Sequence, residues 1–147
     1  MNAEALFNTV HGSDPLRFWP GGQFKPREVT RFLGLDINDV SKMANIAKSS
    51  VRYDHNISRE LSDHLRQIAN ICTLVAEAFD GDTEKTALWF TTTNPLLGDV
   101  APRDMIRVGR YKKLEQFILR ALGRRPAGRS LTREPRTRIV RKQKRRR

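Results

Sequence analysis

The side chains that most often carry catalysis are few and widely separated in this sequence. No two of the three histidines, at positions 11, 55 and 64, share a metal-binding spacing on a helix, and Cys72 is the only cysteine. A phosphate-binding loop needs a Lys-Ser/Thr pair and a helix after its glycines, and the Pro20–Gly22 run has neither. We therefore predict a protein that is not an enzyme and has no catalytic residues, metal site or cofactor. Cys72 falls on an apolar seam, which predicts a buried, inert thiol.

A second group of side chains has the types that contact DNA. Val40, Ala44 and Val51 have the apolar spacing of a helix-turn-helix, with a turn at Asn45 and the small residue Ser41 where the two helices approach. The second helix of that motif lies in the major groove, where Arg pairs with guanine, Asn with adenine, and Ser or Lys with phosphate. We predict this helix over residues 48–55. The side chains expected at DNA are Lys48, Ser49, Ser50, Arg52, Tyr53 and Asn56.

Two stretches resemble a known family. The first, from Asn45 to Arg52, is similar to the turn and recognition helix of Xre-type helix-turn-helix proteins, with Asn45 where that family mostly has glycine. The second resembles the toxin-binding domain of Xre/MbcA/ParS-type antitoxins. It consists of Ala87-Leu88-Trp89-Phe90, Asn94-Pro95-Leu96-Leu97-Gly98, Pro102, Met105-Ile106 and Gly109. The resemblance covers residues 25–122, and its second half is the more specific.

This resemblance implies an all-helical antitoxin of a type II toxin-antitoxin system. Such a protein dimerises, binds its toxin, most often a RES-domain protein that degrades NAD, and occludes the toxin's active site. It also represses its own operon by binding operator DNA. The residues expected at the toxin are Trp89, Asn94, Leu97, Gly98, Pro102, Arg107, Arg110 and Tyr111, with Arg103 and Lys112 on the same surface.

Other interpretations of the same residues stay open. The three short helices around Asn45 also occur as plain packing units, and Trp89, Asn94 and Pro102 suit a purely structural corner of a helical domain. The protein can also be a stand-alone helix-turn-helix regulator that binds DNA or RNA and has no toxin partner. A neighbouring gene for a RES-domain protein would distinguish these two functions.

Helical elements must position these residues, and the sequence predicts an all-α fold. Pro26 and Gly34 bracket a first helix, and Asp36 or Asn38 caps a second. Ser58 caps the longest helix, whose apolar residues recur in steps of four and three: Leu61, Leu65, Ile68, Cys72, Val75 and Phe79. This seam predicts core packing and, in part, a dimer contact. Three further helices are expected, from Asp82 to the Asn94-Pro95 break, from Pro102 to Gly109, and from there to Gly123.

Charge divides the 147-residue chain, which has a formal net charge of +12, into unequal parts. Residues 1–122 hold 16 Lys and Arg against 15 Asp and Glu, whereas residues 123–147 hold 12 against one. We predict a flexible arm over residues 1–24, a helix-turn-helix over 25–57, a toxin-binding domain over 58–122 and a disordered basic tail over 123–147. That tail is expected to bind nucleic acid, to cover an acidic toxin surface, or to act only on solubility. No signal peptide or membrane span is expected, and the single cysteine fits a cytoplasmic protein.

Overall fold

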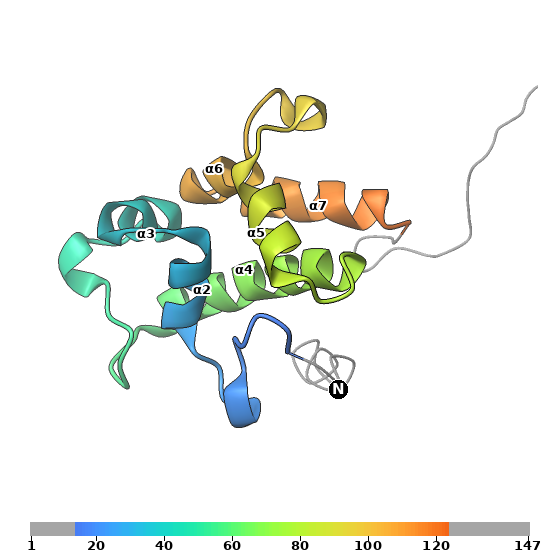
Figure 1. The fold of residues 1–147 in the computed structure, drawn as a ribbon. Coiled ribbons are helices and arrows are strands. Elements are labelled where there is room, and N and C mark those ends of the chain that lie inside the picture. The colour runs from blue at the N-terminus through green and yellow to red at the C-terminus, as the bar shows by residue number, and fades with distance from the viewer. Residues whose placement is uncertain (1–13, 124–147) are drawn as a thin grey trace, which may run out of the picture.

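The structure, a computed structural model, describes residues 14–123. The predicted tail lies outside the described residues except for Gly123, as do the first 13 residues of the predicted arm. Six α-helices and three short 3₁₀ helices make up the described part (Figure 1), whose only β-type pairing is an isolated bridge between Asn94 and Val100. In chain order they are η1 (Pro20–Gly22), α2 (Pro26–Leu33), α3 (Ile37–Ala44), η2 (Lys48–Ser50), α4 (Arg59–Ala78), α5 (Thr83–Thr91), η3 (Pro95–Leu97), α6 (Pro102–Arg107) and α7 (Tyr111–Ala121). The predicted all-α class is confirmed.

Local capping explains where several helices begin. Asp36 and Asp39 form a reciprocal capping box at the start of α3, and the side chains of Ser58 and Asp82 accept backbone N–H bonds at the starts of α4 and α5. These side chains satisfy donors that the first helical turn leaves without a partner. The predicted N-caps of α3, α4 and α5 are therefore confirmed, with Asp36 rather than Asn38 capping α3.

Left-handed backbone ends the first two helices. Gly34 follows α2 with φ 66° and Asn45 follows α3 with φ 57°, a region that glycine and asparagine tolerate best. The Ser41 hydroxyl closes the second turn by donating to the Ile46 carbonyl at 2.5 Å. Both helix ends were predicted from the residue types alone.

Helix α4 is the centre of the core. It packs against α2, α3, α5 and α7, and the seam residues Leu61, Leu65, Ile68 and Cys72 are fully buried. Because a single chain already covers these side chains, the part of the prediction that gave the seam a dimer contact is wrong for them. Phe79, at the end of the seam, is half-buried. Among the described residues, no helix is long and apolar enough to span a membrane.

The described part of the predicted arm is packed on the core. The backbone N–H groups of Phe18 and Trp19 donate to the Asp14 carboxylate at 2.9 and 2.6 Å, and Phe18 is 0% exposed. Its ring meets those of Trp19 and Phe32 edge to face. The burial of Phe18 and the Asp14 turn thus attach this stretch to the core.

One hydrophobic core crosses the predicted boundary at residues 57 and 58. Val29, Val40 and Met43 belong to the same buried cluster as Ile106 and Leu114. Helix α6 also contacts α3 as well as its chain neighbours α5 and α7. The segments predicted for DNA and for the toxin are thus held by one core.

Candidate functional site

Residues 48–57, here called the turn segment, carry the side chains predicted to contact DNA. The structure places one 3₁₀ turn at Lys48–Ser50, followed by residues without helical structure up to Ser58. The prediction of a recognition helix over residues 48–55 is wrong. DNA contacts by this segment would have to come from an exposed turn instead of a helix inserted in the major groove.

Several local features explain why this segment is not a helix. Ala47 has the extended backbone of an N-cap but no side chain that can accept a hydrogen bond, and the first position carries the cation of Lys48. Val51 and Tyr53 are half-buried while Arg52 between them is exposed, an alternation typical of extended chain. The Asp54 carboxylate then accepts the Asn56 N–H at 2.9 Å and closes a turn.

The side chains predicted for DNA therefore have different surroundings. The exposed residues are Lys48, Ser49, Ser50, Arg52 and Asn56. Arg52 pairs with Asp54 at 3.1 Å, and the Asn56 N–H together with this guanidinium lowers the pKa of the Asp54 carboxyl. Tyr53 lies under the Arg27 guanidinium, 5.5 Å from the ring centroid, and burial raises the pKa of its phenol.

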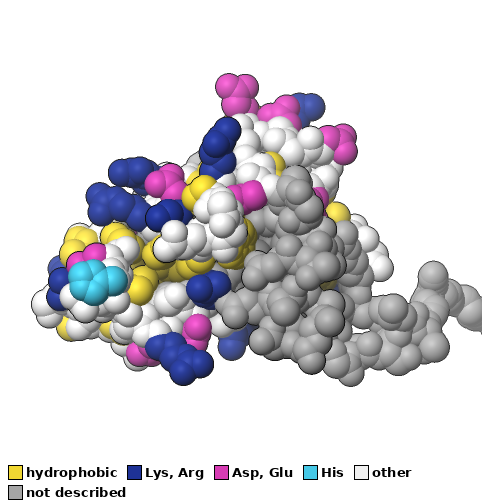
Figure 2. All heavy atoms as spheres, turned by 90° about the horizontal axis from the view of Figure 1, so that it is seen from below, with side chains coloured by type: hydrophobic (Ala, Val, Ile, Leu, Met, Phe, Trp, Pro, Cys, Tyr) yellow, Lys and Arg dark blue, Asp and Glu magenta, His cyan; other side chains and the backbone are white. Residues whose placement is uncertain are grey.

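A groove of about 830 Å³ separates the turn segment from α2 and the start of α3. We call it the arginine groove, because Arg27, Arg31 and Arg52 line it together with Asp36 and Asp54. Acidic neighbours already partner two of its arginines, as Arg31 pairs with Glu28 at 3.0 Å and Arg52 with Asp54. Its charge is therefore mixed. On the face seen in Figure 2, dark blue Lys and Arg side chains likewise alternate with magenta Asp and Glu over the described surface.

The residues predicted for the toxin surround a loop between α5 and α6 that stands out from the helical body (Figure 1). This corner loop, residues 94–100, is held mainly by Asn94. The side-chain oxygen of Asn94 accepts the Leu96 N–H at 2.9 Å. The backbone carbonyl of Asn94 accepts N–H bonds from Leu97 and Asp99, and its backbone N–H donates to the Val100 carbonyl at 3.1 Å. Gly98 turns the chain with φ 80°. The loop thus has a defined shape, which η3 and the isolated bridge between Asn94 and Val100 give it.

Burial separates the predicted toxin-binding residues into two groups. Gly98 and Arg110 are exposed, and Trp89, Asn94 and Leu97 are half-buried. Pro102 is buried, and Tyr111 is 3% exposed with its hydroxyl bonded to His64 Nδ1. The prediction that Tyr111 lies on the surface is therefore wrong. Its ring packs edge to face on the His64 ring, which joins α7 to α4.

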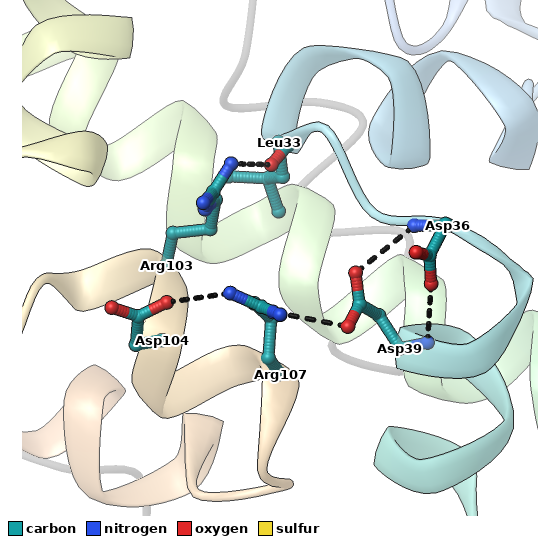
Figure 3. Close-up of polar contacts among 6 residues, drawn as sticks. All are labelled: Leu33, Asp36, Asp39, Arg103, Asp104 and Arg107. Carbon is teal, nitrogen blue, oxygen red and sulfur yellow. Dashed lines mark hydrogen bonds and ion pairs between the residues drawn. The ribbon is translucent and has the colours of Figure 1, made fainter.

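Two arginines of α6 make contacts within the chain. Arg107 bonds Asp39 of α3 at 3.0 Å and Asp104 at 3.0 Å, while Arg103 donates to the Leu33 carbonyl at the end of α2 at 3.4 Å (Figure 3). Arg103 and Arg107, here called the α6 clamp, hold the α2–α3 turn. Both were expected at the partner surface; the structure shows them bonded within the chain, and the Arg107 side chain is still 41% exposed.

The clamp also changes the acidity of Asp39. Burial disfavours ionisation of this carboxyl, but hydrogen bonds from the Asp36 N–H and the Arg107 guanidinium outweigh burial and lower its pKa. Asp39 therefore carries its charge under ordinary conditions and links the start of α3 to α6.

Sequence reasoning missed the most exposed apolar residues of the corner. Leu96 is 79% exposed and Leu88 is 65% exposed. For Leu96 the signal was present in Pro95 and Gly98, because a turn with only Leu96 and Leu97 between these two residues does not bury both side chains. With Val100, which is 37% exposed, these leucines place three large apolar side chains open to water around the corner.

Comparisons with known proteins gave no assignment: no family model, curated protein or solved structure matches this chain. Within residues 14–123, no group of three His, Cys, Asp or Glu side chains is placed to hold a metal ion. Cys72 is fully buried, as predicted, and burial raises the pKa of its thiol.

Proposed function

We propose that this protein is a type II antitoxin that binds a toxin protein through the corner loop and its neighbours. The resemblance of residues 87–109 to the toxin-binding domain of Xre/MbcA/ParS-type antitoxins supports this function. It also names a RES-domain, NAD-degrading toxin as the partner and steric occlusion as the mechanism. The protein dimerises and binds its operator DNA to repress its own operon.

The observation that carries the proposal is the exposure of Leu96 on a loop of fixed shape. Leu88 on α5 and Val100 at the end of the loop are also large apolar side chains open to water. Asn94 orders the loop before any partner arrives, so little conformational entropy is lost on binding. A preordered apolar projection is suited to fill a cleft in another protein, which is what occlusion of an active site requires.

Capture of the toxin tests this proposal directly. The full chain is co-expressed with the adjacent open reading frame and purified, and the retained partner is identified while cellular NAD is measured. Leu96→Asp is expected to abolish capture and to let NAD fall, with unchanged helical content by circular dichroism. Ile37→Asp is the control, since Ile37 is 48% exposed and lies in the arginine groove. Capture by Leu96→Asp as efficient as that of the unmodified chain would contradict the assignment.

DNA binding is the second activity in this proposal, and exposed side chains of the turn segment support it. Arg52 is held only by an exposed ion pair with Asp54, which a phosphate or a guanine can replace at small cost. Loss of one bidentate base contact weakens binding by about 1–3 kcal/mol. In a mobility shift with the chain's own promoter, Arg52→Ala is expected to lose specific binding while Arg59→Ala, on α4, keeps it. A stand-alone regulator would show this DNA binding and capture no toxin.

The basic tail gives this DNA binding a further measurable property. Each phosphate that the tail neutralises contributes about −0.9 to the slope of log affinity against log salt concentration. Removing residues 124–147 is expected to flatten that slope by several units. An unchanged slope would mean that the tail does not contact the DNA backbone and serves the toxin or solubility instead.

A further inference from the structure

A second groove differs from the arginine groove in its chemistry. It lies where the last turns of α4 and α7 meet α5, and its volume is about 130 Å³. The side chains around it are apolar, among them Val75, Phe79, Trp89, Phe117, Ile118 and Leu122. We call it the apolar groove.

The rim of this groove is open to water. Phe79, Trp89 and Phe117 pack on the core with only part of their surface buried, and Leu122 is 37% exposed. Three aromatic rings around one opening leave a concave apolar surface of the kind that receives side chains of another segment.

The first 13 residues of this chain join the described structure next to the groove. Pro15 lies against Gly81, just after the end of α4: the Pro15 Cβ is 3.7 Å from the point where a side chain at position 81 would begin. Gly81 is only two residues from Phe79, so their Cα atoms are at most about 7.6 Å apart. Between Asp14 and Phe7 the chain can extend by about 23 Å, which is ample to reach the groove.

The composition of the first 13 residues matches an apolar groove. Leu6, Phe7 and Val10 have the spacing of one side of a helix, and Glu4 is the only Asp, Glu, Lys or Arg among these residues. The tail also joins the described structure beside the groove, at Leu122 and Gly123. Its 12 Lys and Arg residues, however, would have to leave water to fill an apolar site.

We propose that residues 3–10 of the same chain dock in the apolar groove, with Leu6, Phe7 and Val10 against Trp89 and Phe117. This contact goes beyond antitoxin function and does not depend on it. Trp89 lies on α5, one turn before the corner loop, so the docked segment supports the helix from which that loop projects.

Trp89 is a built-in reporter of this contact. Trp19 is the only other tryptophan, so Trp19→Phe in the full chain leaves the fluorescence of Trp89 alone. In that background, Phe7→Asp is expected to shift the emission to longer wavelength and to raise quenching by acrylamide at least twofold. Asn8→Asp adds the same charge off the apolar side and is expected to change neither. An effect of equal size from both variants, or from neither, would overturn the proposal.

A crosslink identifies the occupant even if Phe7→Asp disturbs the fold. The photoreactive residue benzoylphenylalanine replaces Phe7 in the full chain, and the crosslinked peptides are mapped by mass spectrometry in a mixture of isotope-labelled and unlabelled protein. Crosslinks to Trp89, Phe117 or Leu122 within one chain are expected. Crosslinks between labelled and unlabelled chains would show that a second copy of the chain occupies the groove. Crosslinks to residues outside the groove would mean that the tail or a partner protein occupies it. Either result would overturn the proposal.

Discussion

The corner loop keeps its shape through bonds made within seven residues, whereas the turn segment combines local bonds of Asp54 with contacts to other elements. Asn94 alone accepts or donates four hydrogen bonds inside its loop. Tyr53, the half-buried residue at the middle of the turn segment, instead lies under Arg27 of α2. Local hydrogen bonds shape both segments, but packing against α2 also sets the backbone of the turn segment, and its residue types alone do not reveal that packing.

The two regions also differ in how firmly the core holds them, and this gives the largest expected effect. Ile106, next to the corner on α6, is 0% exposed, whereas Val51 in the turn segment is half-buried. Ile106→Ala is expected to reduce the free energy of unfolding by about 2–5 kcal/mol. Val51→Ala should reduce it by about 1 kcal/mol. Urea unfolding followed by circular dichroism measures both, and equal losses would show that the core holds the turn segment as firmly as the corner.

A smaller effect tests the shape of the corner loop itself. Gly98 has φ 80° with open space around its Cα, so Gly98→Ala introduces backbone strain without a clash, at about 1–2 kcal/mol. Gly22→Ala meets the same conditions, φ 82° and open space, far along the chain from the corner. Both variants are expected to lose similar stability, but only Gly98→Ala should weaken toxin capture. Equal capture by the two variants would mean that the left-handed turn has no part in binding.

This contrast also explains what the sequence could predict. The starts of three helices could be predicted because Asp36, Ser58 and Asp82 accept hydrogen bonds from N–H groups close to them in sequence. The buried seam of α4 could be predicted from helical periodicity. The contacts of the α6 clamp could not be predicted from the sequence. Arg107 and Asp39 are 68 residues apart, and nothing local distinguishes an arginine that meets an aspartate from one that faces water.

The candidate site was predicted less well than the fold for the same reason. Residue types at positions 48–56 suggested a recognition helix, but the missing cap at Ala47 and the inward packing of Val51 and Tyr53 outweighed the apolar spacing. The burial of Tyr111 depends on how α7 packs against α4, which a single sequence does not specify. The resemblance to antitoxins located the corner without specifying which of its side chains face water.

Capping offers a matched pair of changes, one in each region. Asn94→Ala removes the side-chain acceptor at the start of η3 and is expected to reduce the free energy of unfolding by about 1 kcal/mol. Ala47 has φ −66° and ψ 146°, almost the backbone of the N-cap Ser58. Ala47→Asp should therefore supply the cap that the turn segment lacks and raise both stability and helical content slightly. Thermal unfolding with circular dichroism measures both variants, and a loss of stability in Ala47→Asp would show that more than capping keeps residues 48–55 out of a helix.

The smallest expected effect lies in the ion pair between Arg107 and Asp39, which joins α6 to α3. The pKa of Asp39 is lowered in the folded protein, so its carboxylate adds stability above its ordinary pKa of 3.8, and that contribution disappears as pH falls through the lower, folded value. Arg107→Gln removes one cause of the lowered pKa. The variant is therefore expected to be less stable than the unmodified protein near pH 7 and equally stable once Asp39 is protonated in both. Urea unfolding between pH 2 and pH 7 measures this difference.

Arg31→Gln, which breaks only the exposed pair with Glu28 inside α2, is the control. A difference that persists unchanged to pH 2 would mean that Arg107 stabilises the fold by packing on α3, and that charge does not couple α6 to α3.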